Sequence, residues 1–225
     1  MKRPTNPSSF IILLVLAGLL ISGCAEKLPP ADPDLAQQMQ REGLSLLNRG
    51  DFTGASAKLS GAIQYDPQNS RAYLTYTEVL ESIRLFDGAI DVFKNAVDRL
   101  PAGDPSLPLI HYRYGLLLAR NGTDIKKAKQ SLTHVTDPAQ KLDLQGVIEI
   151  YDARPGAALA LFGNALAETK NRDQQARIHY HTALAYHKLG DTAKSNEALF
   201  HAVNNASSLA LKNHIRVFFD TRQPP

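Results

Sequence analysis

The feature that most constrains the fold of this chain is a helical spacing of apolar residues that short breaks interrupt. From residue 35 onward, apolar side chains recur at intervals of three and four positions, as at Ile90, Phe93 and Val97. Clusters rich in Gly, Pro, Asn and Asp, such as 48–51 and 189–191, separate the helical stretches. No part of 35–225 alternates apolar and polar residues for long enough to predict a sheet. The pattern therefore predicts an all-α fold of short antiparallel helices.

The helical stretches also repeat one another. The first two repeats carry small, aromatic and aliphatic residues in the same order: Gly43, Gly50, Asp51, Phe52, Ala55, Leu59, Ala62 and Pro67, then Tyr73, Thr77, Leu80, Phe86, Ala89, Phe93, Ala96 and Pro101. The closing prolines, Pro67 and Pro101, are 34 residues apart. This order and period resemble the tetratricopeptide repeat, a helix–turn–helix unit whose first helix carries a small residue against the second.

Three further units follow with departures from the pattern. The third has one extra residue between Gly122 and Ala128, the fourth has Pro155 at the turn, and the fifth has Ser195 where the family has alanine. The resemblance implies a solenoid of about five repeats over residues 35–206. Residues 207–225 are predicted to form a capping helix and tail.

In this family the first helix of each pair lines a concave surface. By register, the resemblance implies a basic and aromatic peptide-binding groove made by Arg41, Asn48, Arg71, Thr75, Glu78, Tyr112, Arg113, Arg120, Tyr151, Arg177, Tyr180, His181 and Lys188. Arg and Tyr are enriched in protein interfaces, so an acidic or extended peptide is one expected ligand. The alternative is a solvated inner face without a fixed ligand.

The N-terminal segment predicts export and lipidation. Lys2 and Arg3 precede an apolar run of 12 residues, Phe10 to Ile21, which matches a signal peptide and is short of the roughly 20 residues that span a bilayer. Residues 21–24, Ile-Ser-Gly-Cys, resemble the lipobox of bacterial lipoproteins. The resemblance implies cleavage after residue 23 and acylation of Cys24, with an outer-membrane destination because Ala25 follows. The proline-containing segment 24–34 is predicted to be a flexible tether.

Composition and motifs argue against several other classes of function. The formal net charge is +3, and removal of Lys2 and Arg3 leaves +1. Nucleic-acid binding would need a clustered basic face, which this charge does not indicate. The lone cysteine allows neither an internal disulfide nor a Cys-based zinc site. His179 and His181 are two apart and point to different helix faces, so neither a metal nor a cofactor is expected. The sequence also lacks the common nucleotide-binding and hydrolase motifs.

Together these features favour a non-enzymatic role: a lipid-anchored periplasmic adaptor or assembly factor for an envelope complex. Small lipoproteins with this repeat serve type IV pilus and secretin assembly, β-barrel assembly and the regulation of cell-wall hydrolases. The pilotin-like class of pilus biogenesis is slightly favoured, because the chain has a similar size and its repeats begin soon after the tether. The alternatives are a cell-wall-associated enzyme or enzyme regulator, and a structural tether of the envelope.

Overall fold

The computed structural model describes residues 30–120 and 124–220, and the side chains up to residue 216. The chain divides into two units, residues 1–30 and 31–225. The predicted signal peptide, the lipobox and Cys24 lie outside the described residues.

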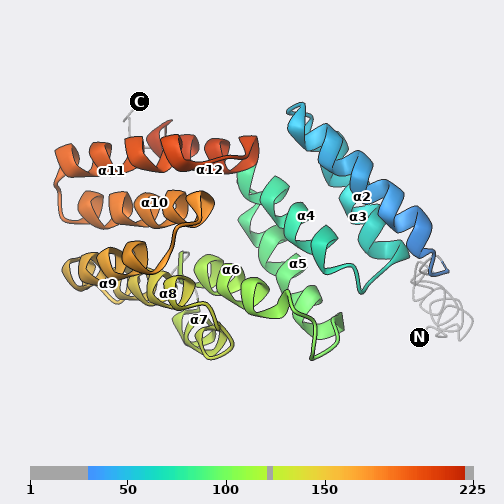
Figure 1. Cartoon of the computed structure of the whole chain (residues 1–225), viewed down its shortest axis with the longest axis horizontal. Coiled ribbons are helices and arrows are strands. Elements are labelled where there is room, and N and C mark those ends of the chain that lie inside the picture. The colour runs from blue at the N-terminus through green and yellow to red at the C-terminus, as the bar shows by residue number, and fades with distance from the viewer. Residues whose placement is uncertain (1–29, 121–123, 221–225) are drawn as a thin grey trace, which may run out of the picture. The chain divides into compact units, whose positions relative to one another are not determined.

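The described part of the chain is all-helical, with short connections and no strand. Its helices, drawn in Figure 1, are α2 (Pro33–Asn48), α3 (Phe52–Tyr65), α4 (Ser70–Ser82), α5 (Phe86–Arg99), α6 (Leu107–Arg120), α7 (Ile125–Leu132), α8 (Pro138–Tyr151), α9 (Pro155–Glu168), α10 (Arg172–Lys188), α11 (Thr192–Asn205) and α12 (Leu209–Asp220). The prediction of five helix pairs followed by a further helix is confirmed.

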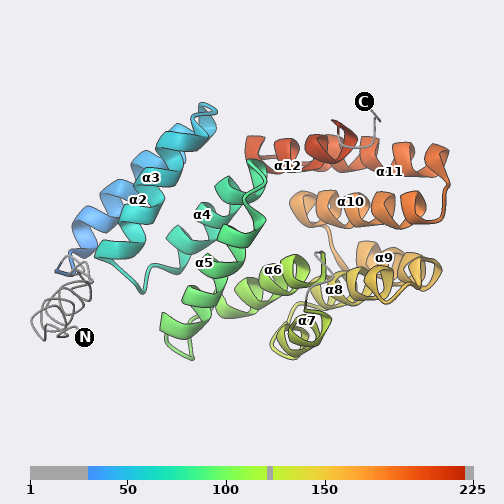
Figure 2. The same cartoon turned by 180° about the vertical axis from the view of Figure 1, so that it is seen from behind.

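The helices pack in the order of the chain. The two helices of each pair pack against each other, from α2 with α3 to α10 with α11. The second helix of each pair also packs on the first helix of the next pair. Figure 2 shows this succession from behind. The first helices also contact one another from α6 through α8 to α10, so they form one layer and the second helices form another. The layer of first helices is the surface that the predicted groove residues occupy.

Local sequence explains where the helices begin. Most begin after an Asp or Asn whose side chain accepts a hydrogen bond from a first-turn backbone N–H, which satisfies a donor that the helix leaves free. These caps are Asp32, Asp51, Asn69, Asp124, Asp137, Asn171 and Asp191. Helix α2 begins at Pro33, two residues before the predicted solenoid boundary, because proline fits the first helical turn. Residues 33 and 34 are therefore helical and are not part of a tether.

Small residues let the two helices of a pair approach closely. A Cβ atom at Gly146 would lie 2.3 Å from the Phe162 ring, and one at Gly43 would lie 2.7 Å from Leu59. Both distances are too short for a real contact, so alanine at either position would force the helices apart. Phe162 and Leu59 are fully buried, and they fill the space that the glycines leave.

Helix α12 departs from the succession of pairs. It contacts α4 more extensively than α11, which precedes it in the chain, and it also touches α2. Its Ala210 packs with Leu47, Leu59 and Val79 of the first repeats. The predicted C-terminal helix is present, but it does not simply extend the stack beyond α11. It lies against first helices near the start of the solenoid.

Candidate functional site

The predicted groove residues all lie on first helices, but the structure places them in three different environments. Those that solvent reaches freely are Arg41, Asn48, Arg71 and Lys188. Those half-buried are Thr75, Glu78, Arg120, Tyr151 and Arg177. Those buried are Tyr112, Arg113, Tyr180 and His181. Peptide binding by this set stays a prediction, but the buried members are committed to contacts within the chain.

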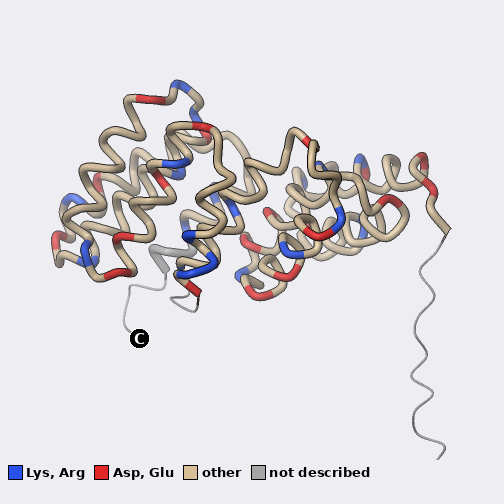
Figure 3. Tube along the Cα trace, turned by 90° about the horizontal axis from the view of Figure 1, so that it is seen from below, with Lys and Arg blue, Asp and Glu red and all other residues tan. Residues whose placement is uncertain are grey.

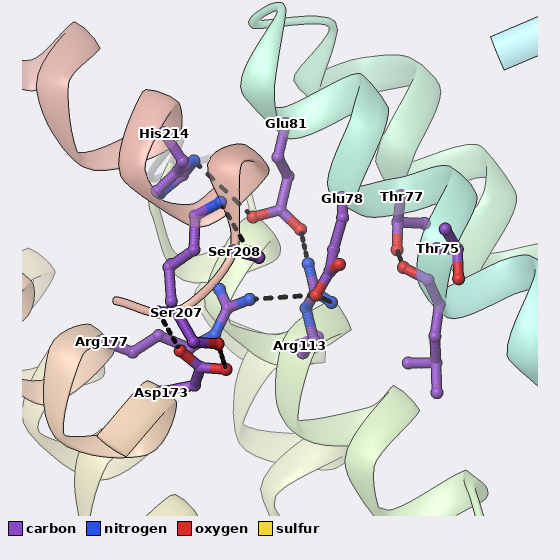
Figure 4. A network of polar contacts seen from close by, with 12 residues as sticks. Thr75, Thr77, Glu78, Glu81, Arg113, Asp173, Arg177, Ser207, Ser208 and His214 are labelled. Carbon is purple, nitrogen blue, oxygen red and sulfur yellow. Dashed lines mark hydrogen bonds and ion pairs between the residues drawn. The ribbon is translucent and has the colours of Figure 1, made fainter. Parts of the chain in front are cut away.

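Arg113 of α6 forms the centre of a buried ion-pair network. Its Nη1 donates to Glu78 Oε1 at 2.9 Å and its Nη2 donates to Glu81 Oε1 at 2.5 Å. The Arg113 side chain is 5% exposed and that of Glu81 is 8% exposed, whereas Glu78 is 32% exposed. Arg177 of α10 reaches the same Glu78 oxygen at 3.4 Å. Figure 4 shows these side chains pointing toward one another from α4, α6 and α10.

The network holds its charges in place. Burial alone would raise the pKa of Glu81, but the nearby charges of Arg113, His214 and Arg177 outweigh it and lower that pKa to about 2. Burial would likewise lower the pKa of Arg113, yet Glu81 and Glu78 raise it. Both groups are therefore ionised at neutral pH, and each depends on the other, because an unpaired buried charge is costly.

A second polar cluster joins α6, α8 and α10. Asp143 is fully buried and accepts a hydrogen bond from the Tyr112 hydroxyl at 2.6 Å. His181 Nδ1 lies 2.9 Å from both Asp143 carboxylate oxygens. Burial, together with the Asp143 charge, raises the pKa of Tyr112 well above its ordinary value, so the tyrosine stays a donor. The cluster links three consecutive repeats.

Helix α12 covers the inner surface beside these clusters. His214 lies with its Nδ1 3.8 Å from Glu81 Oε2, against the ring of Tyr180. Tyr151, Arg120 and Leu184 complete a pocket here whose free space is about 30 Å³. That volume holds one or two water molecules and no peptide side chain. With α12 in place, this part of the predicted groove is filled.

Arg120 has a buried nitrogen on this surface that lacks a hydrogen-bond partner within the described part of the chain. Its Nη1 is buried and has no hydrogen-bond partner among the described residues, and its guanidinium lies 3.9 Å from the centre of the Phe86 ring. The aromatic face partly replaces the missing acceptor, since it attracts a cation.

An open pocket of about 530 Å³ remains on the first two repeats. It is lined by Pro33, Asp34, Gln37, Gln40, Arg41, Leu44, Asp66, Asn69 and Arg71. Hydrogen bonds to amide oxygens arrange its polar groups: Arg41 donates to Gln37 at 2.9 Å and Asn69 donates to Gln40 at 3.0 Å. Amides and guanidinium groups that are accessible in this way can bind the backbone and carboxylates of an extended peptide. Arg41 and Arg71 are thus the predicted groove residues that remain available there.

Three residues of the inner surface were missing from the predicted site. Glu81 lies one helical turn after Glu78, so an acidic pair on one face was a usable signal. Asp143 is a lone carboxylate among apolar neighbours, which is typical of a buried, hydrogen-bonded group. His214 gave no signal, because nothing in the sequence shows that α12 returns to α4.

Histidine pairs occur at two other places in the solenoid. The rings of His111 and His134 stack with centroids 4.3 Å apart, and those of His179 and His201 lie 5.2 Å apart. Burial, followed by the neighbouring ring, lowers the pKa of His111 and of His179. Within residues 30–120 and 124–220, no group of three or more His, Cys, Asp or Glu side chains is placed to hold a metal ion.

Charge is mixed over the described surface. Lys and Arg alternate with Asp and Glu along the helices, without one continuous basic face (Figure 3). This distribution is unlike the basic stripe of a nucleic-acid-binding domain. Within the same residues, no helix is both long and apolar enough to cross a membrane.

Comparison with known proteins supports the repeat fold. Residues 41–105 match the tetratricopeptide repeat family. No curated protein matches the chain. Solved structures that resemble it include the Cut9–Hcn1 hetero-tetramer of the APC/C, with 19% identity and a TM-score of 0.59 over 96% of this chain and 40% of that one. The chain thus spans less than half of that protein.

Two further structures match over most of both chains. PilW, a type IV pilus biogenesis factor, is 13% identical with a TM-score of 0.56, covering 85% of this chain and 94% of PilW. Pseudomonas aeruginosa pilF is 18% identical with a TM-score of 0.51, covering 84% and 86%. At these identities the likeness shows the fold alone. The fold is a tetratricopeptide-repeat solenoid, an architecture that presents extended surfaces to protein partners.

Proposed function

We propose that this protein is a lipid-anchored periplasmic adaptor that binds a protein partner of an envelope assembly through the first helices of its repeats. The observation that carries the proposal is the open pocket on α2 and α4, where Arg41 and Arg71 are exposed among amide side chains. Solenoids of this kind bind partners along surfaces formed by successive repeats.

The anchor in this proposal is Cys24. The positive residues, the short apolar run and the Ile-Ser-Gly-Cys tetrad support lipidation, and Ala25 supports the outer membrane as the destination. Each methylene of an acyl chain that enters the bilayer adds about 0.8 kcal/mol of affinity, so two or more chains hold the protein stably. The lipid then limits the search for a partner to the membrane surface.

The class of assembly is the finer part of the proposal. Two proteins with this fold and similar length are PilW, a pilus biogenesis factor, and pilF. We therefore place the partner among the proteins that build a type IV pilus or its secretin. The proposal rests on the shared architecture and on the lipobox.

The binding role is tested by charge reversal of the pocket. The double variant Arg41→Glu/Arg71→Glu should lose at least 10-fold of the protein partner recovered by crosslinking and mass spectrometry from intact cells. The matched control is Lys94→Glu/Lys170→Glu, which makes the same change of charge at two exposed positions outside the pocket. Equal recovery of all partners by both variants would contradict the proposed site.

The anchor is tested separately by cell fractionation. Cys24→Ser should move the protein from the membrane fraction to the soluble periplasm or leave it as uncleaved precursor. A mature Cys24→Ser protein that stays on the membrane would show that another feature holds it there.

A further inference from the structure

Helix α12 occupies the inner surface in the manner of a ligand. Its Leu211 and Ile215, one helical turn apart, are buried in a cluster with Ala176, Tyr180 and Ala183. Its Ala210 is buried on the other side, against the first two repeats. An apolar pair of this spacing on one face of a helix is a common form of helix-in-groove recognition.

The polar side of the same contact is formed by the ion-pair network. His214 faces Glu81, and the pocket around Ala210 and Leu211 is lined by Glu78, Arg113 and Arg177. Figure 4 shows α12 approaching α4 across these side chains. The surface under α12 therefore combines an apolar floor on α10 and α11 with a charged wall on α4 and α6.

From this arrangement we propose that the inner surface between α4 and α10 is a receptor for an amphipathic helix of a partner protein, which α12 occupies until that helix replaces it. The proposal rests on the adaptor function and names the class of segment that the adaptor binds. The partner helix would present a small residue followed by leucine, then a second aliphatic residue four positions after the leucine.

Helix α12 differs from the paired helices of the solenoid. Within residues 30–120 and 124–220, no second helix pairs with it, unlike each of the five first helices. Residues 206–208 join it to α11, and this joint is held by Asp173, which accepts hydrogen bonds from the Ser207 backbone N–H at 2.7 Å and from its hydroxyl at 2.6 Å. The hydrogen bonds that Arg113 donates to Glu78 and Glu81 involve no residue of α12, so the wall stays formed when α12 leaves.

The position of His214 limits what can occupy this site. The groups that face it are Glu81 on α4, Phe86 on α5, Arg120 on α6, and Arg177, Tyr180 and His181 on α10. Burial and the two guanidinium groups lower the pKa of His214 to about 3, despite the attraction of Glu81. The receptor thus disfavours a cation here, and a partner helix would carry an uncharged hydrogen-bonding residue at this position.

The same environment makes seating of α12 dependent on pH. Once released, His214 regains a pKa of about 6.5, so protonation favours the released state below that pH. At pH 5 the linkage amounts to a roughly 30-fold increase in the ratio of released to seated α12 relative to pH 7.5. Acidification should therefore open the receptor.

The first test uses hydrogen exchange on the unmodified protein at pH 7.5. The backbone amides of residues 213–216 should exchange at least about 100-fold faster than the central amides of α10, because α12 opens locally while the solenoid stays folded. Equal protection of α12 and α10 would mean that α12 leaves only on global unfolding, and this would overturn the proposal.

The second test uses a labelled synthetic peptide with the sequence of residues 207–220. It should bind the full chain carrying Leu211→Glu/Ile215→Glu with a Kd below about 100 µM, and bind the wild type far more weakly, because tethered α12 competes at an effective concentration in the millimolar range. The control peptide carries the same two substitutions. If the variant does not fold, the hydrogen-exchange experiment on the wild type still tests whether α12 leaves the receptor.

The outcomes separate this proposal from the adaptor function. A folded variant that binds neither peptide overturns the receptor while leaving the Arg41 and Arg71 pocket as the test of the adaptor. Peptide binding that requires a dimer, measured by light scattering, would assign the receptor to α12 of a second copy and overturn the partner-helix proposal. Loss of partners in the pocket variant has no bearing on peptide binding between α4 and α10.

Discussion

Replacing Arg113 by methionine should destabilise the protein more than any change at a surface ion pair. Arg113 joins α6 to α4 through two carboxylates, and its side chain is 5% exposed. Methionine has a similar length and preserves the packing of the alkyl chain. The substitution therefore isolates the loss of the positive charge.

The cost of leaving a buried charge unpaired gives the size of the effect. Removing one partner of a buried ion pair typically costs about 3–5 kcal/mol, because the other charge stays buried without compensation. The lowering of the Glu81 pKa to about 2, against the opposing effect of burial, has the same direction. Arg177 and His214 also stabilise the Glu81 charge, so we expect a loss at the lower end of this range, about 3 kcal/mol.

The assay is thermal unfolding followed by circular dichroism at 222 nm. For a domain of this size, about 3 kcal/mol corresponds to a midpoint lowered by roughly 6–12 °C at neutral pH. Because the folded pKa of Glu81 is depressed, its contribution is present above about pH 4.5 and is lost as the pH falls toward 2. The difference between wild type and Arg113→Met should shrink over that range.

Controls make the outcome specific. Lys94→Met removes an exposed ion pair with Asp98 and should leave the midpoint unchanged within error. The double variant Arg113→Met/Glu81→Leu removes both buried charges and should recover much of the lost stability. A midpoint lowered by less than 2 °C in Arg113→Met would refute the assignment of Arg113 as the residue that compensates Glu81.

Other predictions concern packing, hydrogen bonding and pH. Gly146→Ala should lower the free energy of unfolding by about 1–3 kcal/mol in urea, since its Cβ would meet the ring of Phe162. Gly163→Ala, with no neighbour within 4 Å, should raise it by about 0.5–1 kcal/mol. Equal effects of the two substitutions would contradict the close approach of the helices. Asp143→Asn should cost about 2 kcal/mol in the same assay through weaker bonds to the buried Tyr112 and His181, and no change would mean that the carboxylate charge is irrelevant. His214 has a depressed folded pKa, so wild-type stability should fall as the pH drops from about 6.5 toward 3, and His214→Gln should reduce that fall in midpoints measured at pH 7 and pH 4.5.

The sequence was informative about the repeats because their signals are local. Spacing of apolar residues, Asp and Asn caps and glycines at helix crossings each act over one turn or one helix pair. Pro155 was assigned to the turn of the fourth repeat, and α9 begins at that residue, because proline suits the first helical turn. Pro33 was assigned to a tether, yet it begins α2, since proline suits both a tether and the first turn of a helix.

The candidate site was harder to predict because it depends on contacts far apart in the chain. Register along first helices identified Arg113 and Arg177, but not that Glu78 binds both of them. The return of α12 to α4 joins residues more than 100 positions apart, such as Glu81 and His214, and no periodic signal encodes it. Burial of part of the predicted groove follows from that return.

The central claim, that first helices form the partner-binding surface, is tested most directly by photocrosslinking in intact cells. A photoreactive amino acid is placed at Gln37, Arg41 or Arg71 in the open pocket, and at Lys94 or Lys170 for comparison. We expect one protein partner to be captured from the three pocket positions and to be absent from the two others. Capture of that partner only from Lys94 or Lys170 would contradict the claim.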